Sequence, residues 1–331
     1  MPAASPAGRA RTATMRSAVV AEPGVARVVQ LAIPEPGPGE VRVRMEGSGV
    51  CGSNLSFWEG RPWFSYPGEP GAPGHEGWGV VDAVGDRVME LGVGDRITTL
   101  STHAFAEYDI VAADASVVIP PALAEHPVPG EPLACAMNAF RRAEVRSGHT
   151  VVVIGVGFMG ALLTALSAAA GARVIAISRR SFALETARAM GADVTIPLED
   201  HGSIVRLVNE LTGGEGADRV FEAVGQQWPL DLASELTRVR GRLLIAGYHQ
   251  DGRRSVDMQL WNWRGLDVVN AHERDPAVYV QGMREAVVAI ASGRLDPRPL
   301  YTHHYRLDQL GEAMEAMRTR PDGFLKALVL T

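Results

Sequence analysis

The stretch VVVIGVGFMGALLTALSAAAGARVIAISRR, residues 151–180, has the order of a buried strand, a glycine-rich turn, a helix and a second strand. Val151 to Ile154 are consecutive β-branched residues, which is typical of a strand buried on both faces. Ala161 to Ala170 is rich in helix formers, and Gly171 is expected to end that helix. Residues 173–177 predict the next strand. The stretch therefore predicts a βαβ unit.

Three glycines in this unit, Gly155, Gly157 and Gly160, have the spacing G-x-G-x-x-G at the strand–helix junction. Glycines there allow a tight turn and let a pyrophosphate approach the helix N-terminus, where free N–H groups favour an anion. We therefore expect a dinucleotide to contact Gly155, Val156, Gly157, Phe158, Met159, Gly160 and, after a later strand, Val224. The uncharged run 151–172 is also long enough to cross a membrane. The regular glycine spacing argues against that interpretation.

Length and composition fit an ordinary globular enzyme. The chain has 331 residues, enough for about two domains, with 46% hydrophobic and 21% charged residues. A net charge of −6 gives no support to a nucleic-acid or acidic-membrane partner. Residues 1–14 lack the apolar segment of a signal peptide and predict a disordered tail. The two cysteines, Cys51 and Cys135, are too few for a disulfide framework and indicate a cytoplasmic protein. Lys326 is the only lysine, so the chain has almost no residue for a mechanism that needs a lysine base or a Schiff base.

Two sequence patterns divide the chain. Residues 15–112 alternate short valine-rich runs with Gly and Pro, which predicts an antiparallel, barrel-like domain. The proline-rich residues 113–132 predict a linker region. From about residue 130, helices and strands alternate as in a doubly wound parallel α/β sheet. Beyond the first unit we expect helices at 181–190, 203–211, 230–239 and 280–292, and strands at 219–223 and 242–246. Residues 323–330, GFLKALVL, predict a strand that returns to the first domain.

The first domain carries a set of side chains with metal-ligand chemistry. Cys51 lies in GVCGSN, and His75 and Glu76 lie in GHE, all in glycine-rich turns between predicted strands. Thiolate, imidazole and carboxylate are the ligands of a catalytic zinc site, which leaves one position open. Glu131 precedes the nucleotide-binding unit and could complete the set. The spacing alone leaves a second interpretation open, in which Cys51 is a buried small residue and His75 and Glu76 are surface groups.

Several motifs, taken in order, resemble the zinc-dependent medium-chain dehydrogenase/reductase (alcohol dehydrogenase) family. They are GVCGS, PGHEGWGVVDAVGDRV, VGDRI, AFAEY, EPLACAMNAFRRA, VVVIGVGFMG and FEAVG. The likeness is nearest to the sorbitol (polyol) dehydrogenase branch and runs from about residue 15 to 331. It implies a GroES-like antiparallel β catalytic domain, residues 15–128 and 271–331, and a Rossmann dinucleotide-binding domain, residues 129–270. It also implies a homodimer or homotetramer.

The resemblance also assigns site residues. It implies that Cys51, His75 and either Glu76 or Glu131 hold one catalytic zinc, and that Cys135 packs nearby. Ser53 matches the hydroxyl that hydrogen-bonds the alcohol and passes its proton outward. An alcohol activated by zinc would then give hydride to the nicotinamide between the two domains.

Three departures from the family pattern matter. Asn54 stands where an Asp is common, so the anion that orients a zinc-binding His through a hydrogen bond is weakened. Ser56 stands where a relay His is often found, so the outer proton path must use another group or water. The four-cysteine lobe is missing between GDRITTL and HAFAEY. We therefore expect no structural zinc.

The end of the second strand indicates which nicotinamide binds. Ser178, Arg179 and Arg180 stand there, with no acid before Glu185. Guanidinium groups fit the 2′-phosphate of NADP(H), whereas an acidic residue would fit the ribose hydroxyls of NAD(H). We therefore expect NADP(H) to be preferred over NAD(H). A solvated basic strand end is the other interpretation.

The substrate is less well indicated. Two groups of side chains are candidates for a pocket: the aromatic Phe57, Trp58, Trp63, Phe64, Trp261 and Trp263, and the polar His249, Asn270, His272, Glu273 and Arg274. The aromatic group fits a pocket or ordinary packing equally well. The polar group lies where α/β sheets bind ligands. It suits a small-molecule alcohol or ketone such as a polyol, sugar or cyclitol.

Two other functions compete with a zinc alcohol dehydrogenase. One is a metal-free medium-chain reductase acting on a C=N or C=C bond, for which Asn54 and Ser56 leave room. The other is a nucleotide-binding protein without turnover, which would not need Cys51, Ser53 and His75 together.

Overall fold

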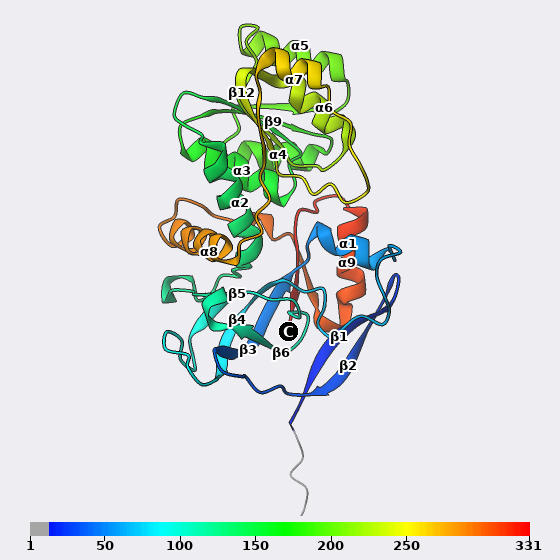
Figure 1. Cartoon of the computed structure of the whole chain (residues 1–331), viewed down its shortest axis with the longest axis vertical. Coiled ribbons are helices and arrows are strands. Elements are labelled where there is room, and N and C mark those ends of the chain that lie inside the picture. The colour runs from blue at the N-terminus through cyan, green and yellow to red at the C-terminus, as the bar shows by residue number, and fades with distance from the viewer. Residues whose placement is uncertain (1–12) are drawn as a thin grey trace, which may run out of the picture.

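The computed structural model describes residues 13–331 of this α/β protein and contains two large sheets. Figure 1 shows them in two lobes, with green and yellow segments in one lobe and blue, cyan and red segments in the other. Most of the predicted tail, residues 1–14, lies outside the described residues. Strand β1 (Thr14–Glu22) begins at the last residue of the predicted tail, so the tail was predicted one residue too long.

The six-stranded sheet confirms the doubly wound fold predicted from the glycine-rich unit. Its order is β10-β9-β8-β11-β12-β13, and every pair is parallel. Val151 to Ile154 in β8 are fully buried because helices cover both faces of this sheet. The strands are β8 (Thr150–Ile154), β9 (Arg173–Ser178), β10 (Val194–Pro197), β11 (Ala217–Glu222), β12 (Thr237–Ile245) and β13 (Asp267–Asn270).

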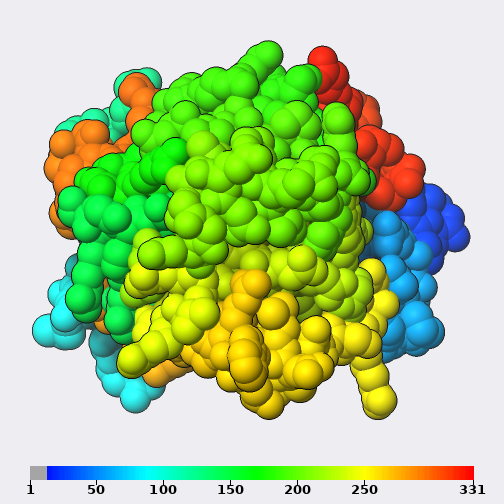
Figure 2. All heavy atoms as spheres, turned by 90° about the horizontal axis from the view of Figure 1, so that it is seen from above, coloured from blue at the N-terminus to red at the C-terminus, as the bar shows by residue number. Residues whose placement is uncertain are grey.

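Five helices connect the strands of this sheet: α3 (Phe158–Ala169), α4 (Ser181–Ala189), α5 (His201–Leu211), α6 (Gln227–Leu236) and α7 (Met258–Arg264). The helix predicted at 230–239 is wrong at its end, because Thr237 begins β12 and pairs with Ala217 of β11. In Figure 2 this lobe fills most of the view from above, and the blue and cyan segments reach only its margins. In the described residues, no helix has the length and apolarity needed to span a bilayer.

The other large sheet has the order β14-β15-β3-β4-β5-β7, with β6 paired to β3. The predicted antiparallel domain is confirmed, with one parallel pair, β14 and β15. Its strands are β3 (Glu40–Gly49), β4 (Glu76–Val84), β5 (Arg96–Leu100), β6 (Tyr108–Ala112), β7 (Ser116–Val118), β14 (His303–Arg306) and β15 (Ala327–Leu330). A hairpin of β1 and β2 (Val25–Ala32) and two helices, α1 (Leu55–Trp58) and α9 (Leu310–Thr319), complete the lobe.

Two predictions about this lobe have opposite outcomes. The return of residues 323–330 is confirmed, because β15 pairs with β3. The linker predicted at 113–132 is wrong. Its residues include β7, whose backbone pairs with β5, and Gly130, which begins helix α2 (Gly130–Ala143).

Helices α2 and α8 (Pro276–Ala291) pack against each other between the two lobes (Figure 1). Helix α2 contacts β4 and β5 on one side and α3 and β12 on the other. The close packing requires Gly282 in α8, because a Cβ there would lie 2.8 Å from Oδ1 of Asn138 in α2. Helix α2 therefore runs between the two sheets and places side chains beside both of them.

Candidate active site between the two sheets

A cavity of about 430 Å³ lies between the lobes and is lined from both of them. Cys51, Ser53 and His75 line it from the antiparallel lobe, and Met159 and Val224 line it from the parallel sheet. The second group follows the carboxyl ends of β8 and β11, where open α/β sheets bind ligands. The cavity therefore joins the predicted metal site and the predicted nucleotide site.

The structure brings three predicted metal ligands together. One donor atom each from Cys51, His75 and Glu76 lies within 4.8 Å of the others, and residues 13–331 contain no other such group. Gly49 at the end of β3 pairs with Glu76 at the start of β4, so the turns that follow β3 and precede β4 meet at one edge. The backbone N–H of Cys51 donates to Asn54 Oδ1 at 3.0 Å, which fixes the turn that carries the thiol.

His75 is oriented by a backbone carbonyl. Its Nδ1 lies 2.9 Å from the carbonyl oxygen of Pro73, which can only accept, so Nδ1 carries the proton. The Asn54 amide also donates to this carbonyl, at 3.1 Å. Nε2 is thereby left with its lone pair free for a metal ion. Where the family commonly has an Asp, Asn54 supports this neutral acceptor instead of supplying a charge.

Glu76 is fully buried and forms an ion pair with the only lysine. Lys326 Nζ donates to Glu76 Oε1 at 2.6 Å and to the Val50 carbonyl oxygen at 3.1 Å. The ammonium also lies 5.0 Å from the ring centroid of Phe158, at the start of α3. The sequence argument gave Lys326 no role. A single charged residue inside the apolar run GFLKALVL is a signal that could have identified it.

Glu131 and Cys135 extend the site along α2. The Cys135 thiol lies 3.2 Å from Glu131 Oε1 and 3.9 Å from the Tyr279 hydroxyl. Burial, and then the charge of Glu131, raises the pKa of Cys135 well above that of a free thiol. Cys135 therefore donates as a neutral thiol, which fits the packing role expected for it. Burial also raises the pKa of Glu131.

The charges of this cluster fit a divalent cation. Burial alone would lower the pKa of His75, but the Cys51 thiolate and the carboxylates of Glu131 and Glu76 raise it to about 10. A metal ion binds neutral His75, and the thiolate and two carboxylates against the Lys326 ammonium then leave an excess of two negative charges. Zn²⁺ would balance that excess, and sulfur, nitrogen and oxygen donors are the ligands it prefers.

The glycine-rich turn fits a phosphate. Gly155 has a φ of +94°, and a Cβ on Gly160 would lie 2.0 Å from the Gly155 carbonyl oxygen, so the fold itself needs both glycines. A Cβ on Gly157 would meet no atom within 4 Å, so packing does not explain this glycine. No side chain caps α3, whose first turn begins there. Close approach of a ligand explains an open glycine beside free N–H groups.

The other predicted contacts of this turn differ in exposure. Val156 and Phe158 are buried, and Phe158 stacks on Tyr301 with centroids 5.9 Å apart. These two residues can therefore offer a ligand only their backbone. Met159 and Val224 line the cavity with their side chains.

Arginines gather at the carboxyl end of β9. Ser178 is buried, Arg179 is exposed, and Arg180 Nη1 donates to the Phe324 carbonyl oxygen. Burial, together with the charges of Arg320 and Arg179, lowers the pKa of Arg180. Arg320 follows α9 in a left-handed conformation and lines the cavity. It was not predicted, because nothing local to residue 320 indicates that the chain returns to this edge.

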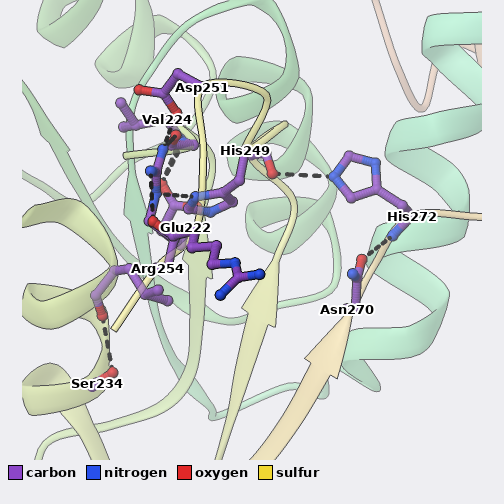
Figure 3. A network of polar contacts seen from close by, with 12 residues as sticks. Glu222, Val224, Ser234, His249, Asp251, Arg254, Asn270 and His272 are labelled. Atoms are coloured by element: carbon purple, nitrogen blue, oxygen red, sulfur yellow. Dashed lines mark hydrogen bonds and ion pairs between the residues drawn. The ribbon is translucent and has the colours of Figure 1, made fainter. Parts of the chain in front are cut away.

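The loop after β12 lines the cavity and is held by a polar network. Figure 3 shows the side chains of this network. Glu222, fully buried at the end of β11, accepts from the N–H groups of Val224 and Gly225 at 2.8 and 2.7 Å and from His249 at 2.9 Å. Arg254 donates to the other ring nitrogen of His249 at 2.9 Å. Beside this network, Gln250 donates to the Gly52 carbonyl oxygen at 3.2 Å and so joins the loop to the Cys51 turn.

None of the aromatic candidates lines the cavity, and Phe57, Trp58, Phe64 and Trp261 pack against other side chains. Trp58 is buried and donates to Glu315 at 2.7 Å, Phe57 stacks on Tyr66, and Trp261 donates to Ser234. Trp63 and Trp263 are 64% and 87% exposed. Tyr248 and Tyr279 line the cavity instead.

Comparisons with known proteins agree with this geometry. Residues 37–121 match the alcohol dehydrogenase GroES-like domain, and residues 149–287 match the zinc-binding dehydrogenase family. An alcohol dehydrogenase of Cupriavidus necator is 29% identical, covering 96% of this chain and 99% of its own. Human sorbitol dehydrogenase is 28% identical, covering 91% and 92%.

A solved structure agrees as well. A putative zinc-binding dehydrogenase of Sinorhizobium meliloti 1021 bound to NADP is 25% identical, with a TM-score of 0.83 over 96% of this chain and 100% of that one. The two family models together span both lobes, and the relatives match nearly full length. The chain therefore belongs to the zinc-type medium-chain dehydrogenase/reductase family and is an oxidoreductase.

Proposed function

We propose that this protein is a zinc-dependent, NADP(H)-preferring dehydrogenase that interconverts a secondary alcohol and a ketone. The substrate class we propose is a polyol, sugar or cyclitol. The observation that carries the proposal is the cluster of Cys51, His75 and Glu76, because Cys51 and His75 line a cavity that Met159 of the glycine-rich turn also lines. Sorbitol and alcohol dehydrogenases among the relatives support the substrate class.

Cys51, His75 and Glu76 are the proposed zinc ligands, and Glu131 is the second carboxylate beside them. When bound, zinc lowers the pKa of a coordinated hydroxyl, and NADP⁺ accepts the hydride from the carbon that bears it. Lys326 holds Glu76 in place, and the Pro73 carbonyl holds His75 with Nε2 toward the cluster. Cys135 and Glu131 form the wall on the α2 side.

Ser53 is the proposed proton acceptor. Ser53 lines the cavity beside Cys51, and the Ser53 carbonyl oxygen accepts a hydrogen bond from the Ser56 hydroxyl at 3.2 Å. Ser53 Oγ can take the alcohol proton and pass it to water, while the hydride leaves the same substrate for the nicotinamide. The alcohol thus loses one proton and one hydride and becomes the ketone.

The cofactor preference is proposed from the arginines. The backbone of residues 155–160 would bind the pyrophosphate, Val224 would pack against the nucleotide, and Ser178, Arg179 and Arg180 would bind the 2′-phosphate. Arg320 is a further cation at that edge. A preference for NADPH over NADH of at least about tenfold in kcat/KM is expected from charge-assisted bonds to the phosphate.

The first experiment is elemental analysis of protein purified without added metal, beside a panel of polyols and cyclic ketones with NADP(H). We expect about one zinc per chain and loss of both zinc and activity in Cys51→Ala. Glu76→Gln and Glu131→Gln, assayed for zinc content, tell which carboxylate is the ligand. Turnover of NADPH by zinc-free protein would favour the metal-free reductase on C=N or C=C bonds.

We also propose a homodimer or homotetramer. In support, β13 ends the parallel sheet, and its outer edge pairs with no strand among residues 13–331. Light scattering on the purified protein tests this, and a monomer at micromolar concentration would contradict it.

A further inference from the structure

Two segments on the parallel-sheet side of the cavity are packed directly against each other. They are the turn after β11, residues 223–225, and the loop after β12, residues 246–255. Residues 223, 224 and 246–248 line the cavity. A Cβ on Gly247 would lie 2.2 Å from the backbone nitrogen of Gly225, and a Cβ on Gly225 would lie 2.6 Å from the Tyr248 carbonyl oxygen. The two segments therefore form one continuous wall, with no room for a side chain between them.

Glu222 joins the two segments with both of its carboxylate oxygens. Oε1 accepts from the backbone N–H groups of Val224 and Gly225, and Oε2 accepts from His249 Nε2 at 2.9 Å. The Glu222 carbonyl oxygen also accepts from the N–H groups of residues 246 and 247, at 2.8 and 2.7 Å. The side chain is 0% exposed, and a buried carboxylate is tolerated only where such donors surround it. Oε1 thus holds the turn, and Oε2 holds the loop.

His249 is restricted to one tautomer by its two neighbours. Nε2 faces a carboxylate oxygen, which only accepts, so Nε2 carries a proton. Nδ1 lies 2.9 Å from Arg254 Nε, which only donates, so Nδ1 carries none. Arg254 is held in turn by the Gly225 carbonyl oxygen at 2.8 Å and by Asp251. Arg254, His249 and Glu222 therefore form a polar chain in which each side chain donates to the next (Figure 3).

The same loop contacts the lobe that carries the proposed metal ligands. Gln250 Nε2 donates to the carbonyl oxygen of Gly52, the residue after Cys51, at 3.2 Å. At its far end the loop is tied to α6, because Ser255 exchanges two hydrogen bonds with the Gln227 side chain, of 2.9 and 2.8 Å. The loop is therefore held at both ends and reaches from the parallel sheet to the Cys51 turn.

The proposed function defines where the nicotinamide must lie relative to this wall. The pyrophosphate is proposed to bind at residues 155–160, and the hydride must reach a carbon near Cys51. The ring therefore occupies the cavity between them, against residues 223–224 and 246–248. A displacement of about 1 Å in such a site can lower the rate roughly 100-fold. What fixes the wall thus matters for hydride transfer.

We propose that the polar chain and Gln250 position the nicotinamide for hydride transfer. The polar chain fixes the wall against which the ring packs, and Gln250 fixes that wall relative to the Cys51 turn. All four side chains are positioning residues, and none exchanges an atom with the substrate. The inference rests on the proposed dehydrogenase function and adds the residues that set its reaction geometry.

The first experiment tests the donor direction of the polar chain. In Glu222→Gln, Oε1 can still accept from the turn, but the amide nitrogen then faces the Nε2 proton of His249. His249 can accept there only by carrying its proton on Nδ1, where it meets the N–H of Arg254. Arg254→Leu removes that second conflict. The double variant should therefore lose less NADPH affinity than the product of the two single losses, by about tenfold.

A cofactor fragment separates positioning of the ring from general damage. Calorimetry compares NADPH with 2′-phospho-ADP-ribose, which has the same phosphates but no nicotinamide. Glu222→Gln should raise the Kd of NADPH about tenfold and leave that of the fragment within about twofold. Equal weakening of both ligands would show structural damage only, and additive losses in the double variant would show that the chain has no donor direction. Either result would overturn the inference.

Gln250→Glu tests the contact with the Cys51 turn. The side chain keeps its size but presents a carboxylate to the Gly52 carbonyl oxygen, which needs a donor. With the best substrate of the polyol panel, kcat should fall about tenfold, while zinc content and the Kd of 2′-phospho-ADP-ribose stay unchanged. The isotope effect with NADPH deuterated at C4, measured on the corresponding ketone, should rise because hydride transfer becomes slower.

Gln30→Glu is the matched control, because it makes the same change at an exposed residue of β2 and should alter none of these values. Unchanged kcat in Gln250→Glu, or a loss of zinc that equals the loss of kcat, would overturn the link to the Cys51 turn.

The binding experiment also covers a protein that turns over no alcohol. That result would contradict the proposed function, but the comparison of NADPH with its fragment needs no substrate. If NADH binds more tightly than NADPH, then NADH and ADP-ribose replace the two probes. A change in the ratio of the two Kd values in Glu222→Gln would still support the positioning of the ring, and an unchanged ratio would overturn it.

Discussion

Replacement of Lys326 by Met should destabilise the metal-free protein strongly. The Lys326 side chain is 4% exposed and its partner Glu76 is 0% exposed, so the substitution leaves a buried carboxylate without the ammonium that donates to it. Breaking a buried ion pair on one side costs about 3–5 kcal/mol. Met keeps the length and apolar character of the lysine stem, so little of this loss comes from packing.

Bound zinc should restore much of the free energy of unfolding that Lys326→Met loses. In the zinc-loaded protein the Glu76 carboxylate has a cation beside it even without Lys326. If about 2 kcal/mol of the loss is recovered in this way, linkage requires Lys326→Met to bind zinc about 30-fold more tightly than the unmodified protein. The variant is therefore expected to be less stable as apoprotein and tighter for the metal.

Urea unfolding of chelator-treated and zinc-loaded protein, with a competitive zinc titration, measures both effects. Arg298→Met is the control, because it breaks an ion pair whose side chains are 58% and 46% exposed and should cost under about 1 kcal/mol. A loss below about 1 kcal/mol in metal-free Lys326→Met, or the same loss with and without zinc, would refute the reasoning.

Three further predictions concern the cofactor and the first lobe. Gly157→Ala should leave the free energy of unfolding within about 1 kcal/mol but raise the Kd of NADPH at least about tenfold, whereas Gly160→Ala should unfold more easily because its Cβ would lie 2.0 Å from a carbonyl oxygen. Thermal unfolding and fluorescence titration check this, and normal NADPH binding by Gly157→Ala would contradict it. Arg320→Gln should raise the Kd of NADPH about tenfold relative to that of NADH, and an equal change for both cofactors would rule out a contact with the 2′-phosphate. Burial raises the pKa of Asp109, so the folded state holds this proton more tightly and the free energy of unfolding should fall as pH rises from about 4 through the raised value. Over this pH range the urea midpoint should fall less in Asp109→Asn than in the unmodified protein. The same pH dependence in both proteins would contradict the prediction.

The parallel sheet was well predicted because its signals are local. The strand at 151–154, the helix after the glycine turn and the strand at 173–177 each follow from neighbouring residues. The errors lie where tertiary pairing decides. Thr237 joins β12 because Ala217 offers it a backbone partner, and residues 116–118 become β7 because β5 lies beside them. The residues of these two segments do not indicate which distant strand they will pair with.

The candidate site divides in the same way. Cys51, His75 and Glu76 could be grouped from the sequence because adjacent antiparallel strands, β3 and β4, carry them. Arg320 could not be assigned to the site from the sequence, because its position depends on how the C-terminal part of the chain folds back onto the parallel sheet. Lys326 was noticed as the only lysine, but its partner is 250 residues away.

That separation has a consequence for synthesis of the protein on the ribosome. At about 5–20 residues per second, the 250 residues between Glu76 and Lys326 take roughly 10–50 s to translate. Residues 130–270, which include the whole parallel sheet, are complete before Lys326 emerges and can fold first. Throughout that interval the nascent Glu76 carboxylate has no ammonium to join, so it stays in water or takes a metal ion. A zinc ion that binds early would therefore meet its proposed ligands before Lys326 has been synthesised.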